Sequence, residues 1–411
     1  MTKNFIHSML YLFSAIFILL GVAGILFGNY NIAWSILIFT IGVIVLFYAT
    51  LKHCKIAKTK VAFCVLIAIL IPALSVPSFY FALYSPYIGV VADYDKKIEI
   101  WGDIIPGNSK ENKLSEMKIN YNARLLGSSL RGNKAITGNY RDEEIAIDTF
   151  TYLYAIKPGN EKQTFEDKPY LIPYTVKNGK GAVIIISGGA YGRKTIDGSN
   201  HEGKDIALSL NKAGINAFVL WYRSNPYEMP IPQLDVQRAV RFLRANAGFY
   251  GFDQSQIALL GFSAGGYQVG SYINRIQGKN FFPEGYTPDN IDTIDDSVSL
   301  AAMIYPVLTY KYNIPMLFSS FESELVKSKD SREKLLQETD LSQHFTSQNI
   351  KQFIAYGLTD TMVPKAGAEE YISTAKINNT EIEVIKVMQG HSFGQIYYMN
   401  KLIEFFQKQS N

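Results

Sequence analysis

The chain divides into an apolar front and a longer remainder of mixed character. Three nearly continuous apolar stretches cover residues 5–28, 32–51 and 61–84, and none contains Asp, Glu, Lys or Arg. About 20 such residues make a helix long enough to cross the hydrocarbon core of a bilayer. A cleaved signal peptide followed by buried helices is the alternative, but its apolar core spans only about 7–15 residues. The pattern therefore predicts an all-α transmembrane region of three helices over residues 1–88, with the lipid bilayer as a partner.

The lysines of this front predict its orientation. The first 90 residues contain five lysines, and four of them lie between the second and third apolar stretches: Lys52, Lys55, Lys58 and Lys60. Short loops rich in lysine stay on the cytoplasmic side of a membrane. We therefore expect a multi-pass protein of the cell membrane with a cytoplasmic N-terminus and an extracytoplasmic remainder.

Residues 89–145 are polar and show no sustained helical or strand period. They predict a spacer and lead-in, in which the short apolar piece 98–101 forms an edge hairpin. Beyond it, in 146–411, short apolar runs alternate with amphipathic ones. The runs predicted as strands are 182–186, 217–221, 257–261, 301–305, 353–356 and 383–387, and those predicted as helices include 202–213 and 232–247. Continuous apolar strands between helices predict an α/β domain with a mostly parallel sheet covered by helices on both faces.

Charge and cysteine content indicate which partners the protein can bind and whether disulfides stabilise the α/β domain. The chain has 40 Lys and Arg against 36 Asp and Glu, and since five lysines belong to the apolar front, the rest is close to neutral. A neutral domain lacks the basic surface that nucleic acid requires, so no nucleic-acid partner is expected. Both cysteines, Cys54 and Cys64, lie in or beside the front, and no disulfide can therefore stabilise the α/β domain.

Residues 261–265 fit the pattern G-x-S-x-G, with Ser263 at its centre. In a sharp turn between a strand and a helix, this pattern exposes a serine hydroxyl at the edge of a sheet. The five-residue pattern alone is weak evidence for a catalytic serine. However, an apolar strand precedes it, and a helix can begin directly after it. A small-residue turn that only packs the helix on the strand is the alternative. The context favours Ser263 as a nucleophile.

A serine hydroxyl needs a base to become a nucleophile, and the base needs an acid that fixes its tautomer. His391 follows the last predicted strand, whereas His344 precedes a strand and is expected to be structural. Asp360 stands just beyond the strand 353–356, where capping of the next helix is the alternative role. The order Ser, Asp, His along the chain is the one found in α/β hydrolases. We therefore predict the catalytic residues Ser263, Asp360 and His391.

The glycine-rich loop 187–192 follows directly after the strand 182–186. A phosphate or dinucleotide loop is the alternative, but the spacing G-x-G-x-x-G and a following Lys-Ser/Thr are both missing. The backbone N–H groups of such a loop can stabilise the oxyanion of an acyl-transfer reaction. We predict oxyanion donors at Gly189, Ala190 and Ala264.

Together these motifs resemble the α/β-hydrolase superfamily, and within it the acetyl esterase and feruloyl esterase-like branch that includes xylan esterase-like proteins. The resemblance rests on the stretches 187–191, 201–203, 221–223, 235–239, 261–266 and 305–307, and on the loops that carry Asp360 and His391. The family usually has His or Pro followed by three glycines at the oxyanion loop. This chain departs from that pattern at Ser187 and Ala190, which affects the expected donor geometry.

The resemblance implies a serine esterase that acts on short acyl esters of carbohydrates, with no metal and no cofactor. Tyr191 and Glu202 are predicted substrate contacts, although Glu202 is also suited to the first turn of a helix. An acyltransferase that uses the same acyl-enzyme, a serine peptidase and a non-catalytic hydrolase-like module remain open as alternatives. The segment 311–340 is a candidate lid. The oligomeric state is not predicted.

Overall fold

The protein is described by a computed structural model. It describes residues 10–19, 40–46, 48–49, 97–108, 168–191, 202–224 and 227–312, and residues 317–408 except 323–324, 327, 348 and 361. The chain divides into two compact units, Met1–Val90 and Val91–Asn411. Each unit is described by itself below.

In the first unit, residues 10–19 and 40–46 are helical. The hydroxyl of Ser14 donates to the carbonyl oxygen of Gly42 at 2.9 Å, so the two helical segments contact each other. Among the residues described, no helix is both long and apolar enough to cross a membrane. Most of the three predicted spans lies outside the described residues, and the transmembrane region stays a prediction.

The second unit is built on a sheet whose described strands follow the order β1-β2-β4-β3-β5-β6-β7-β8. The bounds are β1 Ile98–Glu99, β2 Tyr170–Tyr174, β3 Ala182–Ile186, β4 Asn216–Trp221, β5 Ile257–Phe262, β6 Leu300–Ile304, β7 Lys351–Gly357 and β8 Ile382–Val387. From β4 to β8 every neighbouring pair is parallel, while β1 and β2 run antiparallel at one edge. The predicted, mostly parallel α/β sheet is confirmed. The sequence analysis missed β2, in which Pro173 interrupts a short apolar run.

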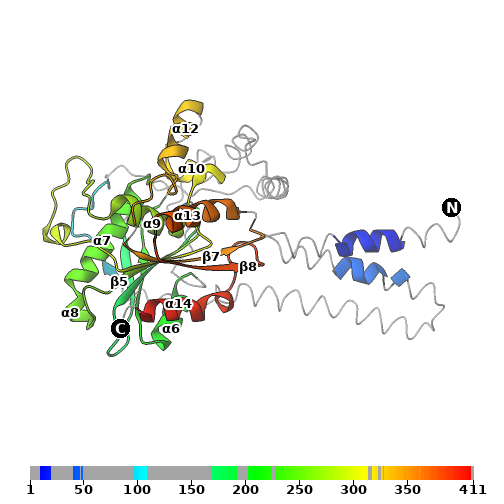
Figure 1. Cartoon of the computed structure of the whole chain (residues 1–411), viewed down its shortest axis with the longest axis horizontal. Helices are drawn as coiled ribbons and strands as arrows, with labels where there is room; N and C mark the ends of the chain where they lie inside the picture. The colour runs from blue at the N-terminus through cyan, green and yellow to red at the C-terminus, as the bar shows by residue number, and fades with distance from the viewer. Residues whose placement is uncertain are drawn as a thin grey trace. The chain divides into compact units, whose positions relative to one another are not determined.

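Helices cover both faces of this sheet (Figure 1). The described helices are α6 Lys204–Lys212, α7 Ile231–Ala245, α8 Ala247–Tyr250, α9 Ala264–Ser271, α10 Leu317–Ser320, α12 Lys329–Glu338, α13 Lys365–Ile377 and α14 Met399–Gln407. Helices α6 and α14 lie on one face, and α7, α9 and α13 lie on the other. A π-helical turn, Tyr272–Ile276, continues α9.

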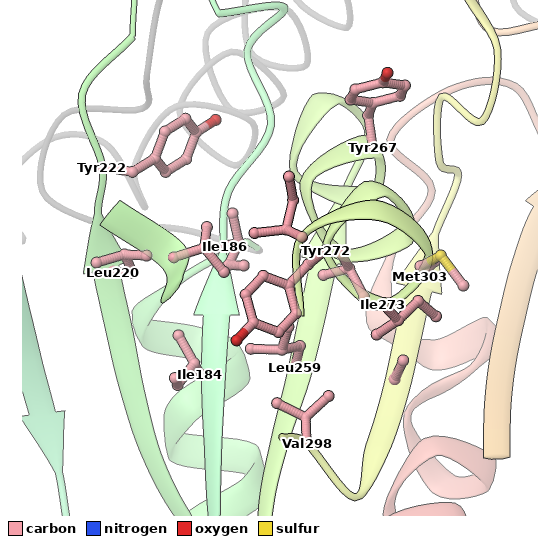
Figure 2. Packing of buried hydrophobic residues seen from close by; sticks show 14 of the residues in the cluster. Ile184, Ile186, Leu220, Tyr222, Leu259, Tyr267, Tyr272, Ile273, Val298 and Met303 are labelled. Atoms are coloured by element: carbon pink, nitrogen blue, oxygen red, sulfur yellow. The ribbon is translucent and has the colours of Figure 1, made fainter. Parts of the chain in front are cut away.

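Successive strand residues point to opposite faces of a sheet, so each buried strand supplies two cores. Ile184 and Ile186 of β3 pack toward α7 and α9, where Figure 2 shows them with Leu259 and Tyr272. The alternate residue Ile185 faces the core under α6 and α14. This explains why the strands are continuous apolar runs.

The lead-in is part of the second unit over residues 97–108. Strand β1 pairs antiparallel with β2, far along the chain, so the predicted hairpin at 98–101 is instead an edge strand. Ile100 and Trp101 are buried in the core on the side of α7 and α9. This piece therefore leads into the sheet at its edge, and residues 109–145 lie outside the described residues.

A buried ion pair fastens the lead-in to the sheet. The Arg223 guanidinium lies 2.7 Å from Asp235, and neither side chain is exposed to solvent. The indole N–H of Trp101 donates to the same carboxylate at 2.8 Å. Arg223 also donates to the carbonyl oxygen of Pro106 and to the side chain of Asn108. Every group of this cluster therefore depends on partners from another part of the chain.

Replacing Asp235 by alanine is expected to destabilise the second unit by about 3–5 kcal/mol, because it leaves a buried guanidinium without its counter-charge. Urea denaturation of the full chain, followed by tryptophan fluorescence, measures this loss. The exposed Glu284→Ala is the control, and surface substitutions of this kind change stability by less than about 0.5 kcal/mol. A loss below about 1 kcal/mol for Asp235→Ala would contradict the assigned role.

The candidate lid is packed onto the second unit in its described parts. The side chains of Leu317 and Val326 are fully buried. The ring of Tyr310, directly before this segment, lies edge-on against Tyr267 of α9 with centroids 4.7 Å apart. Lys311 forms an ion pair with Glu370 of α13. These contacts hold the described parts of the segment against the rest of the second unit.

Candidate active site

Ser263 occupies the sharp turn between β5, which ends at Phe262, and α9, which begins at Ala264. Its φ of 51° and ψ of −114° lie in a region that residues with a side chain rarely adopt. Its N–H donates to the carbonyl oxygen of Ile304 at 3.0 Å, which holds the turn against the end of β6. Such strain persists only where the surroundings impose it, and it is common at active sites.

The glycines of the motif are needed because the backbone approaches itself closely at this turn. A Cβ atom added to Gly261 would lie 2.1 Å from the carbonyl oxygen of Gly265. A Cβ atom on Gly265 would lie 2.1 Å from the carbonyl oxygen of Ile186 in β3. Glycine at both positions thus lets α9 start against the sheet.

Replacing Gly265 by alanine is expected to destabilise the second unit by about 1–3 kcal/mol, because β3 and α9 must separate to admit the methyl group. Gly248→Ala is the matched control: it lies in α8, and its added Cβ would meet no atom within 4 Å. Chemical denaturation of both variants tests the difference. Equal stability of the two would show that the turn tolerates a side chain at position 265.

The structure brings the three predicted catalytic residues together from the ends of three strands. The Nε2 atom of His391 lies 2.9 Å from the Oγ atom of Ser263, and its Nδ1 atom lies 2.7 Å from Oδ2 of Asp360. The side chains of His391 and Asp360 are 5% and 2% exposed. The three groups thus form a continuous hydrogen-bonded chain that is shielded from water at its acidic end.

Asp360 uses its second carboxylate oxygen to fix its own loop. Oδ1 accepts the N–H groups of Met362 and Val363 at 2.9 and 2.8 Å. Helix α13 begins only at Lys365, so Asp360 does not cap it. The two N–H groups hold the carboxylate in one orientation, with Oδ2 directed at His391.

The other histidine that the sequence analysis considered lies in a different environment. The ring of His344 is exposed, and its Nε2 atom lies 3.1 Å from the carbonyl oxygen of Gln337. That contact is local in sequence, as expected for a structural residue. His201 lies outside the described residues.

The glycine-rich loop passes directly beside the serine. A Cβ atom on Gly188 would lie 2.8 Å from the Cβ atom of Ser263. The next three residues, Gly189, Ala190 and Tyr191, have φ values of 110°, 53° and 57°, so the backbone turns sharply here. Ala264 contributes the first N–H of α9, a position where helix amides have no partner within the helix. The predicted donors at Gly189, Ala190 and Ala264 thus belong to the two segments that flank Ser263.

Tyr191 and Glu202, the predicted substrate contacts, are both buried and bonded to the protein itself. The hydroxyl of Tyr191 donates to the carbonyl oxygen of Ala264 at 2.8 Å, and burial raises the pKa of Tyr191 well above its ordinary value. Glu202 accepts the N–H of Gly188 at 2.8 Å and lies ahead of α6 instead of in its first turn. These bonds favour a role in shaping the oxyanion loop over contact with substrate.

Tyr305 is a site residue that no role was predicted for. It follows β6 directly, and its ring lies edge-on against the ring of His391 with centroids 4.9 Å apart. Its hydroxyl donates to Oε1 of Glu202 at 2.9 Å. Burial and the charge of Glu202 raise the pKa of Tyr305 well above its ordinary value, so the hydroxyl keeps its proton at neutral pH. Its place at the carboxyl end of a parallel strand is the signal that could have found it.

The fold and the site together define a serine hydrolase of the α/β-hydrolase type. Comparison with known proteins gives a more particular result: the BD-FAE family model matches residues 170–373, a range that contains Ser263 and Asp360. The match confirms the resemblance that the sequence motifs indicated.

Two curated relatives match shorter stretches. The endo-1,4-beta-xylanase B of Butyrivibrio fibrisolvens is 36% identical over 96 residues, which are 22% of this chain and 14% of that protein. The acetylxylan esterase of Xylanibacter ruminicola is 31% identical over 103 residues, 25% of this chain and 21% of that protein. The chain therefore spans less than a quarter of the length of either relative.

Among solved structures, the acetyl ester-xyloside bifunctional hydrolase from Caldicellulosiruptor lactoaceticus aligns with a TM-score of 0.49 and 22% identity. The alignment covers 62% of this chain and 92% of that one. A truncated carbohydrate esterase from gut microbiota aligns with the same TM-score and 21% identity, over 59% of this chain and 90% of that one.

Proposed function

We propose that this chain is a serine-dependent carboxylic ester hydrolase that acts on short acyl esters of carbohydrates. The observation that carries the proposal is the hydrogen-bonded chain from Asp360 through His391 to Ser263. It ends on a strained turn with a glycine-rich loop beside it. A hydroxyl, a base and an orienting acid in this order make up the machinery of acyl transfer to serine.

In the proposed reaction, Nε2 of His391 takes the proton of Ser263 while Oγ attacks the carbonyl carbon of the ester. The negative charge that develops on the carbonyl oxygen is stabilised by the N–H groups of Gly189, Ala190 and Ala264. The tetrahedral intermediate collapses, the alcohol leaves with the proton from His391, and an acyl-enzyme remains on Ser263. Water, deprotonated by His391, then attacks the acyl group and releases the carboxylic acid.

The substrate class rests on the relatives. One of them is named an acetylxylan esterase and the other a xylanase, so an acetyl group on a sugar hydroxyl is the ester that we propose. Initial rates on p-nitrophenyl acetate, butyrate and octanoate, and then on acetylated xylo-oligosaccharides, test this. The proposal expects the highest kcat/KM on acetate and release of free acetate without an added acceptor. Product that appears only when an acceptor alcohol is present would indicate an acyltransferase instead.

We also propose that three N-terminal helices anchor the protein in the cell membrane, with the catalytic domain outside the cytoplasm. The described helical residues of the first unit support an apolar surrounding, because Leu12, Phe13 and Leu19 are 55%, 51% and 67% exposed. Protease added to intact cells tests the orientation. A catalytic domain that is digested only after the membrane is permeabilised would contradict it.

A further inference from the structure

Glu202 is a buried carboxylate between two parts of the active site. Its side chain accepts the N–H of Gly188 through Oε2 at 2.8 Å and the hydroxyl of Tyr305 through Oε1 at 2.9 Å. The residue is only 7% exposed. Among the described residues no ion pair joins it to a basic side chain, and its two hydrogen-bond donors there are a backbone N–H and a phenol hydroxyl. A buried polar group is costly unless it is hydrogen-bonded. The side chain of Glu202 is therefore held in the orientation that keeps both bonds.

The first contact fixes the oxyanion loop. Gly188 precedes the predicted donors Gly189 and Ala190 and lies against the carbonyl oxygen of Phe262 and the Cβ atom of Ser263. A Cβ atom at position 188 would lie 3.3 Å from Oε2 of Glu202 and 2.8 Å from the Cβ atom of Ser263. The N–H of Gly188 points at Glu202 and is therefore not available to an oxyanion. The bond instead sets the direction in which the next two N–H groups leave the loop.

The second contact reaches the base. Tyr305 has a φ of 38°, and its N–H donates to the carbonyl oxygen of Ala355 in β7. Its ring packs edge-on against His391 at an interplanar angle of 62°. One carboxylate thus holds both the loop beside the serine and the aromatic ring beside the histidine.

We propose that Glu202 is a positioning residue that aligns the oxyanion loop with Ser263 and His391. This proposal rests on the proposed esterase function. Its contribution appears in the transition state, where charge develops on the oxyanion, and not in the binding of the neutral ester. Loss of the carboxylate lowers kcat and the affinity for transition-state analogues while KM changes little.

Three variants of the full chain test the proposal. Glu202→Ala removes both acceptors, and kcat is expected to fall by about 10²–10³-fold, the effect of losing oxyanion donors, with KM within about threefold. Glu202→Gln keeps one oxygen for Gly188, and its amide can donate to the Tyr305 oxygen, so the expected loss is only about tenfold. Asp296→Ala is the matched control. That carboxylate is also buried and accepts a backbone N–H, from Gly278, but it precedes β6 at the opposite end of the sheet from Ser263.

The measurements are kcat and KM on p-nitrophenyl acetate, normalised to sites titrated with a fluorophosphonate, and the inhibition constant of an aryl boronic acid, which mimics the tetrahedral anion. The proposal expects the inhibition constant of the boronic acid to rise in proportion to the loss in kcat for both Glu202 variants. In Asp296→Ala the inhibition constant is expected to stay unchanged. If kcat per titrated site is unchanged in Glu202→Gln and Glu202→Ala, or if KM alone rises, Glu202 is structural or a substrate contact. A wild-type chain that neither hydrolyses esters nor binds the fluorophosphonate overturns the esterase function as well.

Discussion

Replacing Ser263 by alanine is expected to lower kcat for ester hydrolysis by about 10⁵–10⁶-fold. The hydroxyl is the atom that forms the acyl-enzyme in the proposed reaction, and no other oxygen is described within hydrogen-bond distance of Nε2 of His391. The predicted oxyanion donors stay in place, so a residual rate above that of water alone is expected. Steady-state hydrolysis of p-nitrophenyl acetate by the full chain measures the loss.

Ser271→Ala is the matched control for this substitution. Ser271 ends the same helix, α9, and its buried hydroxyl accepts a hydrogen bond from Gln233 at 2.6 Å. Its loss is expected to cost about 1 kcal/mol of stability but to leave kcat within about twofold. Activity of Ser263→Ala within tenfold of the wild type would mean that another group performs the attack.

Asp360→Asn is expected to lower kcat by about 10⁴-fold without unfolding the site. The N–H groups of Met362 and Val363 bind Oδ1 of Asp360, so they require an oxygen at that position in the variant. The asparagine must then direct its NH₂ group at Nδ1 of His391. Nδ1 becomes an acceptor, the ring proton moves to Nε2, and Nε2 can no longer take the proton of Ser263.

The rate of labelling by a fluorophosphonate, together with kcat, measures this effect, and near-ultraviolet circular dichroism checks that the fold is retained. Asp253→Asn is the control, because that exposed carboxylate only accepts bonds from Ser255 in its own turn. A loss smaller than about tenfold in Asp360→Asn would show that the tautomer of His391 is fixed by another group.

The parts of the fold that follow from local pattern were predicted closely. The strands β3 to β6 are buried along their whole length, and this makes each one a largely apolar run that is visible in the sequence. Ser263 was found because it follows β5 directly, and Asp360 and His391 because each lies in the loop just beyond β7 or β8. Parallel strands carry their carboxyl ends to one edge of the sheet, so order along the chain was enough to bring the three together.

The parts that the sequence did not show depend on contacts between distant segments. Strand β1 is only two residues long and is a strand only because β2 lies beside it. The bond from Arg223 to Pro106 joins residues 117 positions apart, and no local pattern marks either one. Glu202 resembles a residue of a helix's first turn in the sequence, whereas its partners Gly188 and Tyr305 lie just after β3 and β6. Side-chain roles of this kind can be recognised only when the folded structure shows which distant segments lie together.

The measurement that tests the central claim most directly is the site of covalent attachment of a fluorophosphonate probe. Trypsin cleavage after Arg244 and Arg275 releases one peptide, residues 245–275, which contains Ser255, Ser263 and Ser271. Fragmentation of the labelled peptide in a mass spectrometer distinguishes the three serines. The account predicts one phosphonyl group per chain, attached to Ser263, and none in the Ser263→Ala or His391→Ala variants. A label on another serine, or labelling that persists in Ser263→Ala, would contradict it.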